Sequence, residues 1–265
     1  MPQGIYAPAC LRRHAVRKWL YFHAAEKWFL RQSRGLLLVN ENELAPWVER
    51  AIGGLPRYVV PNGAPHPGDC PPPRHPLARC DAEGITRWGY CGRMFDAQKG
   101  VDRLVRCFLA FRQQRPGEDH RLSLVGDGPD LPAIRRRYRR AIAAGELEVH
   151  GALFGTAKVE HLRRMHYFAH LSRWEGVPLA CLEAAALGVP LLVTPGTNLA
   201  ADVVRFGAGA VADGNAQSVI AAMHSLTNAD YGRMVAGCRR LVAEKYNWQR
   251  TATLLAAIYR KVLGL

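Results

Sequence analysis

The sequence predicts an α/β fold built on a doubly wound parallel sheet, with an incomplete α/β portion before it. From residue 86 onward, short segments predicted as strands alternate with amphipathic stretches of helical periodicity. Such alternation is typical of parallel strands joined by right-handed helical crossovers. Ahead of this part, seven of the sixteen residues from 61 to 76 are proline. Regular elements do not tolerate that density, so a linker is predicted there.

The elements follow in chain order. A helix, a strand, a second helix and a second strand are predicted up to Val60, where the turn signal Pro61-Asn62-Gly63 ends the strand. The strands of the main sheet are predicted at residues 88–91, 122–125, 147–149, 168–171, 190–193 and 210–212. The helices between and after them are predicted at residues 101–114, 131–144, 156–166, 179–187, 198–206, 216–226, 231–245 and 248–263. The first of these shows the reason, because apolar residues at positions 101, 104, 105, 108 and 111 share one helical face.

Composition sets the broad class. Of the 265 residues, 49% are hydrophobic and 22% are charged, which is the balance of a globular protein. No apolar run approaches the roughly 18 residues of a membrane-spanning helix, and no secretory signal is expected. Seven cysteines without a CxxC pair favour reduced thiols, so a cytoplasmic protein is expected.

The net charge of +14 favours anionic partners: nucleic acid, acidic lipid headgroups or phosphorylated small molecules. No nucleic-acid-binding signature accompanies the charge, so a basic nucleic-acid-binding protein is only a remote alternative. Within residues 12–29, basic residues are interleaved with aromatic ones such as Trp19 and Trp28. This pattern suits a helix resting on a membrane surface, and it equally suits aromatic residues buried in a core.

Ligands bind such sheets at the carboxyl ends of the strands, so the loops there are the candidate site. Arg93 and Lys99 follow the first strand of the sheet and could hold a diphosphate, since arginine forks onto phosphate oxygens and lysine adds a point charge. Gly126 opens a glycine-rich turn after the second strand. Taken singly, these residues are equally consistent with surface cations and an ordinary turn.

The loop after the fourth strand carries more chemistry. Gly176 allows a ligand to approach the backbone, and Pro178 suits the first turn of the next helix, whose free N–H groups favour an anion. Glu175 and Glu183 form an E-x7-E spacing, and carboxylates accept hydrogen bonds from hydroxyl-rich ligands. A capping acid and a surface glutamate are an equally good interpretation of that spacing.

Taken together and in order, these motifs resemble the retaining nucleotide-sugar glycosyltransferases of family 4, which have the GT-B architecture. The motifs that carry the resemblance are Gly92-Arg93, Lys99-Gly100, Gly126-Asp127-Gly128-Pro129, Glu175 with Glu183, and Gly188-Val189-Pro190. The resemblance implies a Rossmann-like donor-binding domain at residues 86–247 and a crossover helix at 248–265. It also implies that residues 64–85 are the linker. Residues 1–63, which begin with the motif at residues 2–5, would be a remnant of the N-terminal acceptor domain.

The resemblance also implies roles. Arg93 and Lys99 would bind the donor diphosphate, and Glu183 would accept hydrogen bonds from the ribose hydroxyls. Glu175 would face the transferred sugar, as the catalytic candidate. The backbone of Gly176, Val177, Pro178 and Leu179 would meet the phosphates or the sugar. The nucleobase would lie near Gly126 and residues 150–154. Asp202 is the nearest match to an acid that the family places after its fifth strand.

The implied function is transfer of a sugar, with retention of configuration, from a nucleoside-diphosphate sugar to a saccharide or lipid-linked acceptor. The alternative is a truncated, inactive donor-binding half that needs a partner. Neither needs a cofactor, because the nucleotide sugar is a substrate. His166 and His170 are the candidate metal pair, and since His170 falls in a predicted strand, no metal site is expected. The expected location is cytoplasmic, with peripheral contact to the cytoplasmic membrane face.

Overall fold

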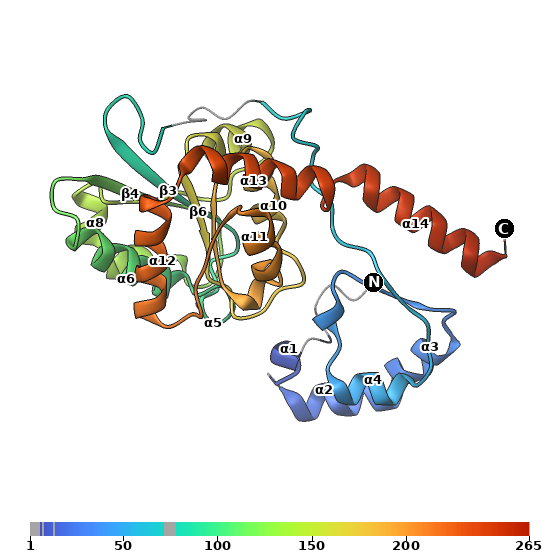
Figure 1. Ribbon diagram of the computed structural model, residues 1–265. Helices are drawn as coiled ribbons and strands as arrows, with labels where there is room; N and C mark the ends of the chain where they lie inside the picture. The colour runs from blue at the N-terminus through green and yellow to red at the C-terminus, as the bar shows by residue number, and fades with distance from the viewer. Residues whose placement is uncertain (1–5, 7, 13, 72–77, 265) are drawn as a thin grey trace.

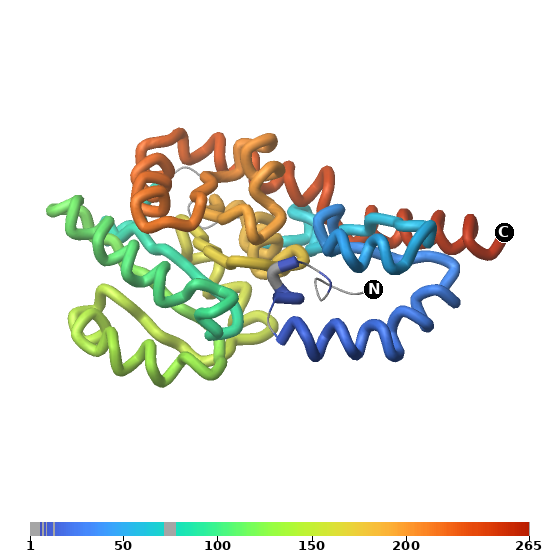
Figure 2. Tube along the Cα trace, turned by 90° about the horizontal axis from the view of Figure 1, so that it is seen from below, coloured from blue at the N-terminus to red at the C-terminus, as the bar shows by residue number. Residues whose placement is uncertain are grey.

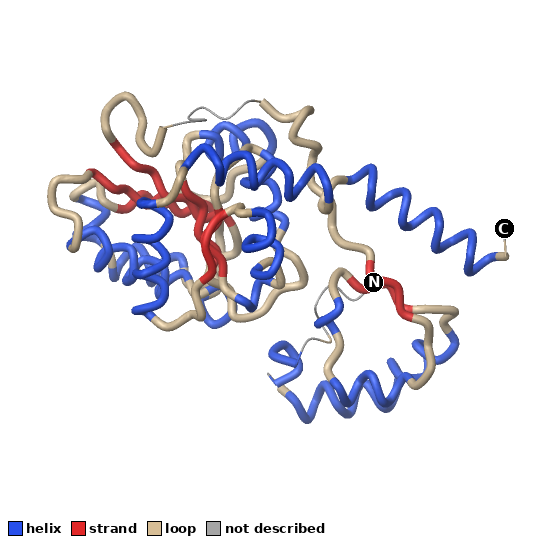
Figure 3. The backbone as a smooth tube through the Cα atoms, in the orientation of Figure 1, coloured by secondary structure: helices blue, strands red, loops and turns tan. Residues whose placement is uncertain are grey.

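The computed structural model describes residues 6, 8–12, 14–71 and 78–264. Residues 2–5, Arg13 and the linker segment 72–77, on which some sequence interpretations fall, lie outside the described residues. The described part contains a six-stranded sheet and a two-stranded sheet, both parallel (Figure 3).

The predicted doubly wound sheet is confirmed. Its strands are β3 (Ile85–Cys91), β4 (Asp119–Val125), β5 (Leu147–Val149), β6 (Tyr167–His170), β7 (Leu191–Val193) and β8 (Gly209–Val211). Their order is β5-β4-β3-β6-β7-β8. The chain therefore winds outward from β3 to one edge, returns beside β3 with β6, and winds to the other edge. Strands β3 and β4 begin three residues earlier than predicted, because Ile85 pairs in register with Asp119.

Helices cover both faces of this sheet (Figure 1). The connections between the strands contain α5 (Asp96–Lys99), α6 (Val101–Gln113), α7 (Leu131–Arg137), α8 (Arg139–Ala143), α9 (Gly155–Arg163), α10 (Leu179–Ala186), η3 (Pro195–Thr197) and α11 (Ala200–Phe206). Two helices, α12 (Ala216–Asn228) and α13 (Tyr231–Glu244), follow the last strand of the sheet. Side chains of α6, α7, α8 and α12 enter the core on one face, and those of α9, α10 and α11 enter the core on the other. Helix α13 contributes to both.

Two predicted helices differ from the structure. The helix predicted at 131–144 is divided at Tyr138, whose hydroxyl donates to the Asp102 carboxylate at 2.7 Å while the residue stays buried. The helix predicted at 156–166 ends at Arg163. His166 instead belongs to the approach to β6, where its backbone N–H donates to the Arg87 carbonyl at 2.8 Å. In both cases a tertiary hydrogen bond overrides local helical periodicity.

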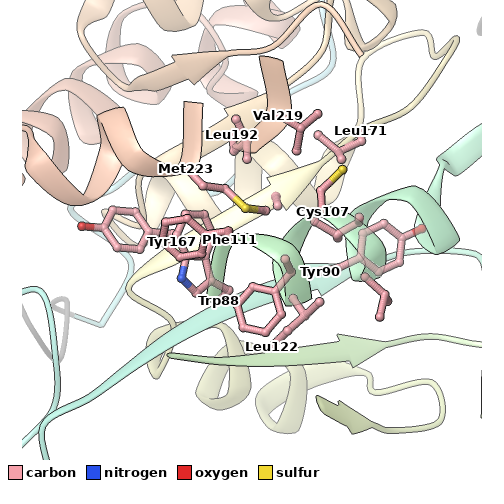
Figure 4. Close-up of a cluster of buried hydrophobic side chains, with 14 of the residues drawn as sticks. Trp88, Tyr90, Cys107, Phe111, Leu122, Tyr167, Leu171, Leu192, Val219 and Met223 are labelled. Carbon is pink, nitrogen blue, oxygen red and sulfur yellow. The ribbon is translucent and has the colours of Figure 1, made fainter. Parts of the chain in front are cut away.

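Trp88 lies at the centre of the larger core (Figure 4). Its ring is fully buried, with ring centroids 4.6 Å from Tyr167 and 5.7 Å from Phe111. The indole N–H finds a buried partner in His120 Nδ1 at 3.4 Å, as a buried tryptophan requires. This packing fixes β3 against β6, the two strands that frame the site described below.

The N-terminal portion forms a small α/β unit. Its elements are α1 (Pro8–Arg12), α2 (Ala15–Tyr21), η1 (Phe22–Glu26), α3 (Lys27–Gln32), β1 (Leu36–Leu38), η2 (Glu41–Glu43), α4 (Pro46–Ile52) and β2 (Arg57–Val59). The predicted alternation of helix and strand is confirmed here. Helix α4 joins the parallel strands β1 and β2 and buries Val48 and Ile52 against them.

The C-terminal helix α14 (Trp248–Leu263) runs from the large sheet to this N-terminal unit, as Figures 1 and 2 show. At its start, Thr251 Oγ1 donates to the Pro61 carbonyl at 3.0 Å. At its end, the Arg34 guanidinium donates to the Val262 carbonyl at 3.2 Å. The helix thus connects the two α/β parts through both of its ends. No helix among the described residues is both long and apolar enough to cross a membrane.

Candidate functional site

A cavity of about 300 Å³ lies at the carboxyl ends of β3 and β6. The direction of winding reverses between these two strands, and crevices at such positions are where doubly wound sheets bind ligands. The residues that line the cavity are Val39, Asn62, Cys91, Gly92, Lys99, His170, Glu175, Gly176, Val177, Pro178, Leu179 and Ala180. Six of the nine predicted site residues are in this set; Arg93, Gly126 and Glu183 are not.

Glu175 is the most strongly bound side chain of the cavity. Its Oε1 atom contacts Lys99 Nζ, accepts from Ser172 Oγ at 2.8 Å and lies 3.2 Å from His170 Nε2. Burial by itself would raise the pKa of Glu175, but the hydrogen bond to His170 and the charge of Lys99 outweigh burial and lower the pKa to about 2. The cavity therefore contains a fixed carboxylate whose negative charge persists throughout the physiological range.

Lys99 is the last residue of α5 and places its ammonium in the same cavity. The side chain is 14% exposed, against 10% for Glu175. An ammonium has three N–H donors, so Lys99 can contact Glu175 and still donate to an anionic ligand. The pair offers a cation and an anion at one point, which suits a ligand carrying both phosphate and hydroxyl groups.

The backbone after Glu175 is held from both parts of the chain. Asn40 and Asn62, from the N-terminal unit and the start of the linker, donate through Nδ2 to the carbonyls of Gly176 and Val177 at 3.0 and 3.3 Å. Asn198 Nδ2 donates to the Glu175 and Gly176 carbonyls at 2.8 and 3.0 Å. These bonds fix the loop that leads into α10, and the first N–H groups of that helix have no intrahelical acceptor.

Gly126 belongs to the support of the cavity. Its φ is +143°, and a Cβ there would lie 1.9 Å from the Gly92 carbonyl oxygen. Its own N–H donates to the Gly151 carbonyl at 3.1 Å. The structure thus brings together the loops after β3, β4 and β5, including the region predicted for the nucleobase.

Arg93 and Glu183 lie at the margins. The Arg93 side chain is exposed, with its guanidinium carbon 5.7 Å from the centre of the Phe95 ring. Glu183, on α10, forms an ion pair with Lys158 Nζ of α9 at 2.6 Å, and both side chains are more than a quarter exposed. Neither side chain therefore lines the cavity, although Lys158 fixes that of Glu183.

Asp202, His166 and His170, which the sequence analysis also singled out, have different surroundings in the structure. The Asp202 carboxylate accepts from Lys245 Nζ at 2.8 Å and from the Tyr246 hydroxyl at 2.6 Å, so it holds α11 to the end of α13. His166 and His170 lie at opposite ends of β6: His166 Nδ1 accepts from the Arg87 N–H at 3.0 Å, whereas His170 lines the cavity. In the described ranges, no group of three metal-ligating side chains is found.

Sequence reasoning did not assign roles to Ser172, Asn40, Asn62 or Asn198, and considered His170 only as a metal ligand. Asn62 was visible only as a turn residue, and Asn40 is 136 positions from the carbonyl to which it donates. Ser172 and His170 directly precede the Glu175 loop, at the end of a predicted strand. Their position at the end of a predicted strand was the signal from which a place in the site could have been inferred.

Comparisons with known proteins identify the family and the fold. Residues 86–229 match the family described as glycosyl transferases group 1. A comparison with curated proteins gives no match. Solved structures share the fold of this chain, which is similar to that of GT-B glycosyltransferase domains.

Three solved structures illustrate the likeness. Sucrose-phosphate synthase from Thermosynechococcus elongatus has a TM-score of 0.72 at 21% identity, covering 90% of this chain and 61% of that one. A TarM variant from S. aureus, in complex with UDP, has a TM-score of 0.71 at 16% identity, covering 90% and 46%. HepE from Anabaena, in complex with UDP and glucose, has a TM-score of 0.71 at 15% identity, covering 92% and 67%. The chain thus spans about half to two thirds of the length of these proteins. Because the family match extends over more than half of its residues, the chain belongs to the glycosyl transferases group 1 family.

Proposed function

We propose that the chain binds a nucleoside-diphosphate sugar in the cavity between β3 and β6 and serves transfer of that sugar to a saccharide or lipid-linked acceptor. The observation that carries the proposal is the Lys99–Glu175 pair beside the start of α10, at the reversal point of the sheet. Retention of configuration, as in the family 4 enzymes that the motifs resemble, is part of the proposal. The UDP and glucose in the HepE complex support the class of donor.

The donor diphosphate lies between Lys99 and the backbone of Gly176, Val177, Pro178 and Leu179. Negative charge grows on the diphosphate as the bond to the sugar breaks, and preorganised donors stabilise it there. Arg93 closes over the outer phosphate by a rotamer change. The chain itself supplies this stabilisation, so the proposal assigns no resident metal or cofactor.

The rest of the donor extends along the same edge of the sheet. Glu175 accepts hydrogen bonds from the transferred sugar, and Glu183 accepts them from the ribose hydroxyls. The nucleobase lies toward Gly126 and residues 150–154, where the loops after β4 and β5 meet. The roles of Glu175 and Glu183 rest on carboxylates being hydrogen-bond acceptors.

A second candidate function is a donor-binding half that works only with a further segment or subunit. The observation in its favour is the α2–α3 surface, formed by the exposed side chains of Val16, Trp19, Leu20, Tyr21, Trp28 and Phe29. Apolar exposure on this scale marks an interaction site. The alternative occupant of this surface is the cytoplasmic face of a membrane. Flotation with acidic vesicles distinguishes the two: binding of the chain to vesicles assigns the surface to lipid, and absence of binding favours a protein segment.

Replacing Lys99 tests the donor site. Lys99→Ala should weaken binding of a nucleoside diphosphate by about 1.5–3 kcal/mol, because a charged hydrogen bond to phosphate is lost. Arg93→Ala should act in the same direction. Isothermal titration with UDP, GDP and ADP measures the effect, and Arg136→Ala, which removes an exposed cation of α7, is the control. Equal affinity of the unmodified chain and the Arg93, Lys99 double variant would contradict the assigned site.

Glu183 tests the ribose position separately. Glu183→Ala should lower the affinity for nucleoside diphosphates that keep both ribose hydroxyls by about 1–2 kcal/mol and leave 2′,3′-dideoxy analogues unaffected, since only the former donate to the carboxylate. Titration of both analogues into both proteins gives the comparison. A uniform loss for both analogues would move Glu183 out of the ribose site.

A further inference from the structure

His170 is a buried histidine for which donor binding, as proposed above, gives no role. It is the last residue of β6, is 1% exposed and forms part of the wall of the cavity. Its ring is stacked with the ring of Tyr90 from β3, at 5.4 Å between centroids and 15° between planes. The ring of Phe168, two residues earlier, is also parallel to it, at 6.3 Å. These neighbours fix the plane of the imidazole.

The hydrogen bonds of the His170 ring determine which ring nitrogen carries the proton. The Glu175 carboxylate can only accept, so Nε2, 3.2 Å from Oε1, carries the proton and donates. The other nitrogen, Nδ1, is buried and has no hydrogen-bond partner among the described residues. Burial lowers the pKa of His170, so the ring is neutral at physiological pH. Charged or titratable groups facing it are Glu175, Lys99 and Tyr90.

All the contacts recorded for the Glu175 carboxylate fall on one oxygen. Lys99, Ser172 and His170 each contact Oε1, whereas the described residues offer no donor to Oε2. The carboxylate is thus fixed at one atom and available at the other. Of the three partners, Lys99 is the one whose ammonium a diphosphate would also attract.

We propose that His170 is a positioning residue for Glu175. When Lys99 donates to the donor diphosphate, the neutral N–H of His170, together with Ser172, keeps Oε1 engaged. Oε2 then stays directed at the hydroxyls of the sugar. The inference rests on the proposed function and adds a determinant of sugar recognition, distinct from recognition of the diphosphate.

The test compares two substitutions. His170→Leu removes the donor at similar volume, and His170→Gln keeps an N–H at a comparable reach. The nucleoside diphosphate that binds the unmodified chain best, and its glucose conjugate, are titrated into each protein. We expect His170→Leu to weaken the conjugate about tenfold while changing the diphosphate alone by less than about twofold, and His170→Gln to restore the preference.

A second readout needs no ligand. The pKa of the Glu175 carboxyl is measured by NMR on ¹³C-glutamate protein, with Glu175→Gln assigning the signal. His170→Leu should raise this pKa by about one pH unit, and His170→Gln should not. His166→Leu is the matched control: it removes a buried histidine at the opposite end of β6 and should leave the Glu175 pKa unchanged.

These readouts separate two failures. If none of the nucleoside diphosphates UDP, GDP and ADP binds, the proposed function is overturned, together with the role of His170 in sugar recognition. The NMR titration still decides whether His170 holds Glu175. If His170→Leu leaves the Glu175 pKa and the preference for the conjugate unchanged, the positioning role is overturned while donor binding stands. The same holds if His170→Gln behaves as His170→Leu does.

Discussion

Replacing Gly126 with alanine should lower the free energy of unfolding by about 3 kcal/mol or more and abolish detectable nucleotide binding. Two costs combine. The φ of +143° is a conformation that L side chains rarely adopt, which costs about 1–3 kcal/mol. A Cβ would also lie 1.9 Å from the Gly92 carbonyl oxygen, and overpacking against backbone adds about 1–3 kcal/mol. Because Gly92 lines the cavity, relieving the clash displaces the cavity wall.

Urea unfolding and titration with a nucleoside diphosphate measure the two effects. Gly54→Ala is the control, since Gly54 lies in the N-terminal unit outside the cavity, has no positive φ, and a Cβ on it meets nothing within 4 Å. It should leave stability within about 0.5 kcal/mol and leave binding unchanged. A Gly126→Ala protein as stable as the control would show that the loop after β3 moves freely, and would remove Gly126 from the support of the site.

The sheet could be predicted because its determinants are local. Runs such as residues 190–193 and 210–212 are short, apolar and flanked by helical periodicity, which leaves few alternatives to a buried parallel strand. The general preference for right-handed crossovers supported a doubly wound parallel sheet, whereas the strand order is known only from the structure. Boundaries failed where a distant residue decides them: Asp102 divides the predicted helix at Tyr138.

The candidate site could be predicted only in part, and for the same reason. Glu175 and Lys99 lie in the connections that follow β6 and β3, which the topology brings together, so position after strand ends was enough to find them. His170 was not assigned its place because its partner is known only once the loop after β6 turns Glu175 back over the strand. Asp202 shows the converse: the resemblance made it the nearest match to an acid of the family, but Lys245 and Tyr246 hold its carboxylate in the structure.

Protonation of Glu175 should remove about 3 kcal/mol of stability at low pH. Its pKa in the folded protein is about 2, against an ordinary value of 4.5, and each unit of difference corresponds to about 1.4 kcal/mol. A carboxyl whose pKa is lowered by folding stabilises the protein at pH values above 4.5. That contribution is lost as the pH falls from 4.5 through 2. At 10% exposure, solvent screens the carboxylate little.

The measurement that isolates this effect is the difference in unfolding free energy between the unmodified protein and Glu175→Gln at pH 7, 5 and 3. The variant leaves Lys99 without its carboxylate at every pH, so the informative quantity is how the difference changes with pH. Integrating the linkage between the two pKa values, the advantage of the unmodified protein should shrink by about 2 kcal/mol between pH 7 and 3. Glu183→Gln, which breaks a more exposed ion pair, should show little of that dependence. Parallel stability curves for the unmodified protein and Glu175→Gln would mean that Lys99 and His170 do not hold Glu175 in its charged form. In that case, the fixed carboxylate on which sugar recognition depends would not exist.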